Sequence, residues 1–242
     1  GKDDDMAEKT PVTKKLEENI AQMEKLFENC DDIKKKRICL GEAGDIPCYL
    51  TFIEVSVDMG NSALLEMLKY LRSMPKEELY HSLSNNALAV SDVTYFPTIE
   101  EAADGLLTGE TILFVDGFEQ ALKVPDDGYP NMGVGEAESE KVVRGSNEGF
   151  TDSVKQNAAL IRKRVRSPKV KVRQKKMGVR SNTNVYLVYM DELVYPGLVA
   201  EIEERLSSFE IDGVPDSGIL EQLSEEKWYS PFPQFQTTQR PD

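Results

Sequence analysis

The sequence predicts an α/β protein built of two small mixed α/β subdomains, each a short sheet with flanking helices, joined by a linker. Apolar residues at helical spacing alternate along the chain with short apolar runs rich in β-branched residues. A stretch rich in proline, glycine and acidic residues, at 126–140, interrupts this pattern. With 242 residues, the chain has room for one core on each side of that stretch.

The predicted boundaries follow from these features. An amphipathic helix is expected near the start of the chain, because Leu16, Ile20, Met23 and Phe27 recur at spacings of four, three and four. The stretch at 126–140 buries too little apolar area to order itself, and we take it as a linker. The expected parts are a tail with that helix, a first subdomain, the linker and a second subdomain, at residues 1–30, 31–125, 126–140 and 141–242.

In the first subdomain, two apolar runs with β-branched residues predict strands at residues 36–40 and 46–57. Leucines at helical spacing then predict a helix that ends before Pro75, and a second helix covers about 77–85. The two predicted helices are expected to pack on the sheet that contains the two predicted strands.

The rest of the first subdomain carries clear local signals. The sequence Thr98-Ile99-Glu100-Glu101 has the spacing of a capping box and begins a helix that Gly109 ends. Residues 111–115 and 118–124 are expected to form a β-hairpin, since Asp116-Gly117 between them suits a tight primed turn.

The second subdomain begins with a helix over about Val154 to Val165, with Thr151 as its N-cap and Ser167-Pro168 as its end. The run at 185–190 is apolar on both faces and predicts a central strand. A further helix follows Pro196, with Glu201, Glu203 and Glu204 expected on its outer side, and Ser217 is expected to cap a short one.

The charge is unevenly distributed. The net charge is −14, yet residues 162–176 hold nine basic residues and no acid, leaving 20 basic and 43 acidic residues elsewhere. Lysines and arginines at 169, 171 and 173 alternate with valines, so the first interpretation is a strand with one solvated face. The second is an anionic partner, either an acidic surface on a neighbouring subunit or lipid headgroups. Nucleic acid comes last, because no aromatic residue is interleaved for stacking.

No pattern in the sequence indicates catalysis. The one histidine, His81, is expected on a helix surface, and Cys30, Cys39 and Cys48 lack the tight spacing of a metal site. The sequence contains no phosphate-binding Walker loop, no dinucleotide fingerprint and no calcium loop. It also contains no run of about twenty apolar residues. We therefore expect no enzyme activity, no cofactor and no metal.

The most informative stretch is Arg144-Gly145-Ser146-Asn147-Glu148-Gly149-Phe150, just before a helix. Two glycines around Glu148 predict a tight turn, with Phe150 anchoring it in the core. Glu148 and Arg144 are expected to form a buried ionic lock with Arg162 that holds the turn on its helix. A functional alternative is that the turn reports a conformational change.

Together with Pro231-Phe232-Pro233 and Gln239-Arg240-Pro241-Asp242, this stretch resembles the A subunit of the GerA family of spore germinant receptors, over about residues 34–242. The chain departs from the family pattern at Ser146, Asn147, Asp152 and Gln239. The family positions that it keeps, and that we take as structural or coupling residues, include Arg144, Gly145, Glu148, Gly149, Phe150, Asn157 and Arg162, with Thr151 and Arg164 beside them.

The resemblance implies a soluble domain on the cytosolic side of the spore inner membrane, followed by a membrane domain. It implies an integral-membrane B subunit and a lipoprotein C subunit as partners, and a homo-oligomer formed through the membrane domain. Such a complex senses nutrients and triggers ion release, and this domain would act in assembly and coupling without catalysis. The alternative is a small-molecule domain that binds the germinant in a cleft between the two subdomains. A nucleic-acid or anionic-lipid adaptor that uses residues 162–176 is a third hypothesis, and nucleic acid is not expected as a partner.

Overall fold

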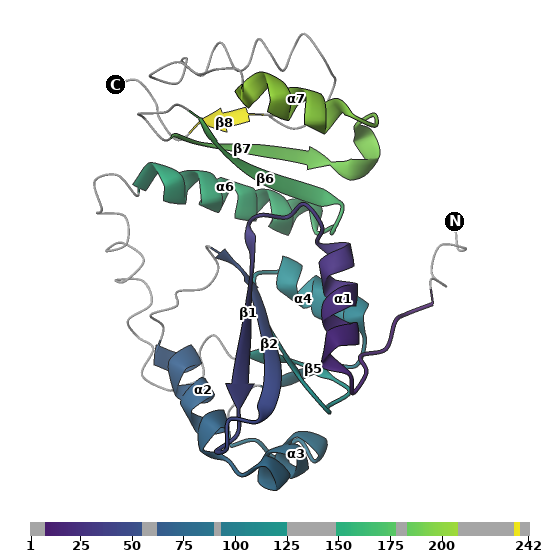
Figure 1. Ribbon diagram of the computed structural model, residues 1–242, viewed down its shortest axis with the longest axis vertical. Coiled ribbons are helices and arrows are strands. Elements are labelled where there is room, and N and C mark those ends of the chain that lie inside the picture. Colours follow the sequence, from purple (N-terminus) through teal and green to yellow (C-terminus); the bar gives the residue numbers. More distant parts are fainter. Residues whose placement is uncertain are drawn as a thin grey trace. The chain divides into compact units, whose positions relative to one another are not determined.

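The computed structural model describes residues 8–54, 62–89, 93–124, 149–177, 183–207 and 235–237. The chain divides into two compact units, one of residues 1–26 and 33–133 and the other of residues 27–32 and 134–242. Each unit combines a sheet with helices, so the predicted mixed α/β class with two subdomains is confirmed (Figure 1).

The sheet of the first unit has five strands, all paired antiparallel, in the order β1-β2-β4-β5-β3. The strand β2 has seven of its eight residues buried, as expected for a strand covered on both faces. The strands are β1 (Ile33–Leu40), β2 (Ile46–Ile53), β3 (Thr94–Phe96), β4 (Thr111–Val115) and β5 (Ala121–Val124).

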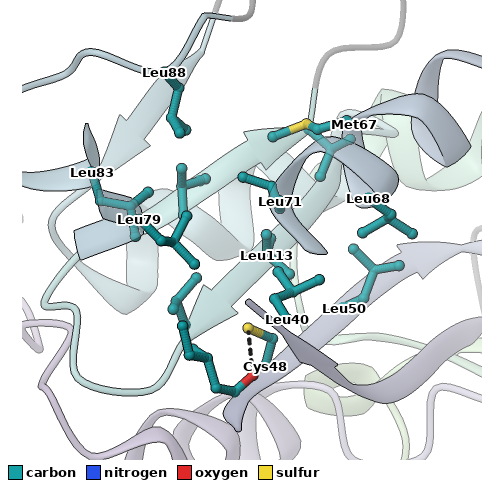
Figure 2. Close-up of a cluster of buried hydrophobic side chains, with 14 of the residues drawn as sticks. Leu40, Cys48, Leu50, Met67, Leu68, Leu71, Leu79, Leu83, Leu88 and Leu113 are labelled. Atoms are coloured by element: carbon teal, nitrogen blue, oxygen red, sulfur yellow. Dashed lines mark hydrogen bonds between the residues drawn. The ribbon is translucent and has the colours of Figure 1, made fainter. Parts of the chain in front are cut away.

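Four helices complete the first unit: α1 (Leu16–Leu26), α2 (Ser62–Ser73), α3 (Lys76–Ser84) and α4 (Ile99–Leu107). The helices α2 and α3 supply leucines and methionines to the main apolar cluster, where they meet alternate residues of β2 such as Cys48 and Leu50 (Figure 2). The helices α1 and α4 contact β2 and β4. Helix α1, expected as part of a separate N-terminal segment, thus belongs to the first unit.

The hairpin of β4 and β5 confirms the predicted strand at 111–115, but the second strand begins at Ala121 and not at residue 118, and the predicted two-residue turn is wrong. Phe114 pairs with Ala121, so the connection is longer than Asp116-Gly117. The turn also holds the start of α1, because the Asp116 carboxylate accepts a hydrogen bond from the Leu16 N–H. The Gly117 N–H also donates to the Lys14 carbonyl. The acid near a helix N-terminus is favourable for the helix dipole.

The predicted start of α4 is confirmed, with Thr98 as its N-cap. The Thr98 hydroxyl accepts a hydrogen bond from the Glu101 N–H at 3.2 Å and donates to the Glu101 carboxylate at 3.0 Å. The strand β3 just before it was not predicted, because three residues are too few to show a periodicity.

The second unit has a three-stranded sheet in the order β6-β7-β8, with both pairs antiparallel. Alternate residues of β7 face two separate apolar clusters, one that contains α6 and one that contains α7. The two helices therefore cover opposite faces of the sheet (Figure 1). The elements are α6 (Gly149–Val165), β6 (Val170–Met177), β7 (Thr183–Met190), α7 (Leu198–Ser207) and β8 (Phe235–Thr237), with a short 3₁₀ helix η3 (Asp191–Leu193) after β7.

In the second unit, one local prediction is wrong and another lies outside the described residues. Helix α6 begins at Gly149, so Thr151 is its third residue and the prediction of Thr151 as its N-cap is wrong. Gly149, which was predicted to belong to a turn, is the first residue of the helix. The short helix expected after Ser217 lies outside the described residues.

Gly117 generates a test of packing in the first unit. Its φ is +83°, and an added Cβ would lie 2.8 Å from the Tyr80 hydroxyl and 3.2 Å from its ring. Gly117→Ala should cost about 1–2 kcal/mol of backbone strain and about 1–3 kcal/mol more from overpacking. Urea unfolding followed by circular dichroism measures the loss.

The matched control is Gly44→Ala. Gly44 also has a positive φ, +62°, but an added Cβ would meet nothing within 4 Å. This variant should therefore show only the backbone strain. Equal losses for the two variants would show that the Tyr80 ring moves aside without cost.

Candidate functional site

Residues 27–32, which we name the docking segment, lie along the edge of β6 in the second unit. Cys30 pairs with Val172 as an isolated parallel bridge. The Val172 N–H donates to the Asn29 carbonyl at 3.2 Å, and the Asp31 N–H donates to the Val172 carbonyl at 2.7 Å. The segment therefore acts as a short extra strand that satisfies backbone groups on the β6 edge.

The docking segment is fixed by a buried ion pair between Asp32 and Arg162 of α6. The Arg162 Nε donates to one Asp32 carboxylate oxygen at 2.5 Å, and its Nη2 donates to the other at 2.8 Å. The Nη1 donates to the Val170 carbonyl at 3.0 Å. The side chain of Arg162 is 0% exposed and that of Asp32 is 6% exposed. We name this arrangement the Arg162 clamp.

The electrostatics keep the clamp charged. Burial alone would lower the pKa of the Arg162 guanidinium, but the hydrogen bond and the charge of Asp32 outweigh it, so the pKa is raised. A bidentate pair of this kind is geometrically specific, and removal of one partner would leave a buried charge uncompensated.

Cys30 lies next to the clamp but is not a reactive thiol. Burial raises its pKa, and the nearby positive charges of Arg162 and Lys171 offset this only in part. The Cys30 Sγ lies 3.7 Å from the Val170 carbonyl, to which it donates. Burial also raises the pKa of Cys48 to about 12. Nucleophilic cysteines need the opposite shift.

A second set of charges surrounds the docking segment on the α7 side. The Gln174 N–H donates to the Asp31 carboxylate at 2.8 Å, as a side-chain substitute for a ladder hydrogen bond. Arg173 lies 3.7 Å from Asp31 and 3.1 Å from Glu203 of α7. Lys175 lies 3.5 Å from the same Glu203. Glu203, expected on the outer side of its helix, therefore lies over β6 because two cations of the strand attract it.

These pairs bear on the basic stretch at 162–176. Several of its nine basic residues have an ion pair with a described acid of the second unit: Arg162 pairs with Asp32, Lys169 with Glu192, Arg173 with Asp31 and Glu203, and Lys175 with Glu203. Lys171 is only 7% exposed. The stretch is thus not a uniformly solvated strand face. Its exposed cations are Lys163, Arg164, Arg166 and Lys176, together with Lys169 in its surface pair.

The predicted motif residues are only partly described. Arg144, Gly145 and Glu148 lie outside the described residues, and Gly149 and Phe150 are the first two residues of α6. Asn157 is exposed on α6, and Arg162 is buried. The expected lock of Arg162 with Arg144 and Glu148 thus stays a prediction, and the partner of Arg162 that the structure describes is Asp32.

Sequence reasoning missed Asp32 and the docking segment. The only local signal was a pair of acids, Asp31-Asp32, between a predicted helix and a predicted strand. An acid at such a place is ordinary on a surface, and its partner lies 130 positions away in the sequence. No spacing rule connects the two residues.

The first unit contains a hollow of about 550 Å³ beside the turn between β4 and β5. Its lining combines a cation, a carboxylate, two other polar side chains and an aromatic ring, in Lys14, Glu119, Ser84, Gln120 and Tyr80, with Gly117 and Phe118. The Tyr80 hydroxyl donates to the Asp116 carbonyl, which holds the ring at the hollow. The lining is mostly polar.

Other residue types give no further site in the part of the chain that the structure describes. His81 is exposed, as predicted. In those same residues, no group of three or more His, Cys, Asp or Glu side chains could hold a metal ion. Among the described helices, none has both the length and the apolar character needed to cross a bilayer.

The fold resembles a solved one. It matches the crystal structure of the N-terminal domain of the A subunit of the Bacillus megaterium spore germinant receptor GerK3, with a TM-score of 0.62 and 24% identity. The match covers 93% of this chain and 84% of that chain. At this identity, the likeness establishes the fold.

Curated relatives match nearly the whole chain. The uncharacterized membrane protein YfkQ of Bacillus subtilis is 33% identical over 96% of this chain and 45% of its own length. Spore germination protein KA of Bacillus subtilis is 26% identical over 96% of this chain and 43% of its own length. Spore germination protein A1 of the same organism is 29% identical over 97% of this chain and 48% of its own length. The chain thus spans a little under half the length of these relatives.

A family comparison covers more of the chain than any single motif. The model of the Bacillus/Clostridium GerA spore germination protein matches residues 21–242, which include the docking segment, the clamp and both sheets. The resemblance found in the sequence is therefore confirmed, and the chain belongs to the GerA family of spore germination proteins.

Proposed function

We propose that this chain is the N-terminal domain of a germinant receptor A subunit, which acts in receptor assembly and in coupling nutrient sensing to germination, without catalysis. The observation that carries the proposal is the family match over residues 21–242. The fold likeness to the GerK3 domain supports it. The relative YfkQ is named a membrane protein, which supports a place in a membrane receptor. The proposed setting is the spore inner membrane with this domain on the cytosolic side, and the proposed partners are the B and C subunits.

The Arg162 clamp supports the coupling part of the proposal. Helix α1 ends at Leu26 and β1 begins at Ile33, both in the first unit, whereas residues 27–32 between them belong to the second. The chain therefore passes to the second unit and back within six residues. A buried bidentate pair holds these six residues in the second unit, which supports a role of the clamp in coupling.

A double-mutant cycle tests how strongly the clamp holds. Arg162→Met should destabilise the chain by about 3–5 kcal/mol, because it leaves the Asp32 carboxylate buried without its partner. Arg162→Met combined with Asp32→Leu should cost less than Arg162→Met alone, because both buried charges are gone. Urea unfolding of the 242-residue chain measures the losses of Arg162→Met, Asp32→Leu and the double variant.

The control for the cycle is Arg205→Met on α7. Arg205 pairs with Glu201 at 3.9 Å with both side chains more than a third exposed. Its loss should therefore cost at most about 0.5 kcal/mol. An additive cycle, in which the double variant costs the sum of the single ones, would contradict the clamp.

A germination assay of spores tests the coupling role. The double variant Arg162→Met/Asp32→Leu is placed in the full-length protein, and spores are exposed to the nutrient that the wild type senses. With receptor levels matched by immunoblot, we expect at least a tenfold slower fall in optical density, since the bidentate geometry is lost while no buried charge remains. Arg205→Met should germinate normally. Normal germination of the double variant would limit the clamp to folding.

A second candidate function is the binding of a small polar molecule, which the hollow in the first unit favours. Titration of the chain with amino acids, sugars, nucleosides and inorganic ions, followed by amide NMR shifts, detects millimolar affinity, about −4 kcal/mol. Binding there predicts saturable shifts at Gly117 and Gln120 that Lys14→Ala or Glu119→Ala weakens. Absence of saturable shifts across the set would remove this candidate. The predicted cleft between the subdomains stays a prediction, and the same titration tests it.

A further inference from the structure

The outer face of α6 combines an exposed apolar side chain with exposed cations. Asn157, Leu160 and Arg164 lie at positions i, i+3 and i+7 of the helix, with Lys163 beside them. All four are exposed, and Leu160 is 51% exposed although it is a large apolar residue. The opposite side of the helix, with Val154 and Ala158, packs in the core. We name these four residues the outer face of α6.

The cations of this face differ from those of the neighbouring strand. Arg173 and Lys175 of β6 are paired with acids of the second unit, as described above. Lys163 and Arg164 are exposed in the last turn of α6, and Arg166, also exposed, follows the helix end. Cations near a helix C-terminus are favoured by the helix dipole, which explains their place but not the exposed Leu160 among them.

We propose that the outer face of α6 binds anionic lipid headgroups. The inference rests on the proposed place of this chain in a membrane receptor. Apart from residues 162–176, the chain has 20 basic and 43 acidic residues, so an anionic bilayer repels most of its surface. A face with cations around an exposed leucine is attracted to such a bilayer and places an apolar side chain at the headgroup boundary. The face therefore also sets which side of the second unit lies toward the membrane.

The shape and chemistry of the face favour lipid over other anionic partners. A helix face is convex, and a single leucine needs no preformed pocket in a fluid bilayer, whereas a protein partner needs a complementary groove. The face has no aromatic residue among its four, so it offers no stacking for the bases of a nucleic acid. Each cation near an anionic surface adds to the attraction.

Vesicle co-sedimentation of the 242-residue chain tests the proposal. Vesicles that contain 30% phosphatidylglycerol in phosphatidylcholine should bind the chain at low salt, and vesicles of phosphatidylcholine alone should bind it at least about tenfold more weakly. Raising the salt should weaken binding to the anionic vesicles, because the Debye length falls. Lys163→Glu/Arg164→Glu should reduce the affinity for anionic vesicles at least about tenfold, and Leu160→Ser should reduce it about threefold.

The matched control is Lys36→Glu/Lys69→Glu, which changes the net charge equally at two exposed positions of the first unit. This variant should bind as the wild type does if the face is specific. Equal loss in both double variants would mean that only net charge matters and would overturn the proposal. No binding at low salt, or equal binding to neutral vesicles, would also overturn it. The vesicle assay does not depend on germination, so its result can be interpreted even if the germination test of coupling fails.

Discussion

The ion pair of Arg162 and Asp32 is the interaction on which the organisation of the second unit depends. It joins α6 and the carbonyl of Val170 at the start of β6 to the docking segment, which lies 130 positions away from Arg162 in the sequence. A buried guanidinium is tolerated only when its N–H groups have hydrogen-bond acceptors. The Arg162 guanidinium donates three hydrogen bonds, two to the Asp32 carboxylate and one to the Val170 carbonyl. Six residues between two elements of the first unit are thereby held in the second.

Charge organises the second unit at two levels. The buried clamp and the half-buried pairs of Arg173 and Lys175 with Glu203 hold segments against the sheet. Arg173 and Lys175 of β6 belong to the basic stretch at 162–176, which a count from the sequence treats as one uniform group of cations. What remains exposed on α6 is a smaller cationic face around Leu160, which is a better defined candidate surface than the whole run of nine basic residues.

In the first unit, the residues of one turn have two structural roles. Asp116 and Gly117 connect β4 with β5, and they also hold the start of α1 through the Leu16 N–H and the Lys14 carbonyl. Gly117 lies so close to Tyr80 that only glycine fits without movement. The neighbouring hollow is therefore formed by residues whose positions are fixed for structural reasons.

The sequence by itself determined the fold class, most helices and strands, and the family, because local periodicity, the Thr98 capping box and the motif residues are encoded by neighbours in the chain. The exact ends of several elements, such as β1, β2, β5 and α6, differ from the predicted ones, and β3 and β8 are too short to show a periodicity. Only the tertiary structure decided that Asp32 is the described partner of Arg162, that Glu203 turns toward β6 and that Asp116 caps α1. These choices join residues that are tens to more than a hundred positions apart, and no local pattern specifies which distant group satisfies a buried charge or an unpaired N–H.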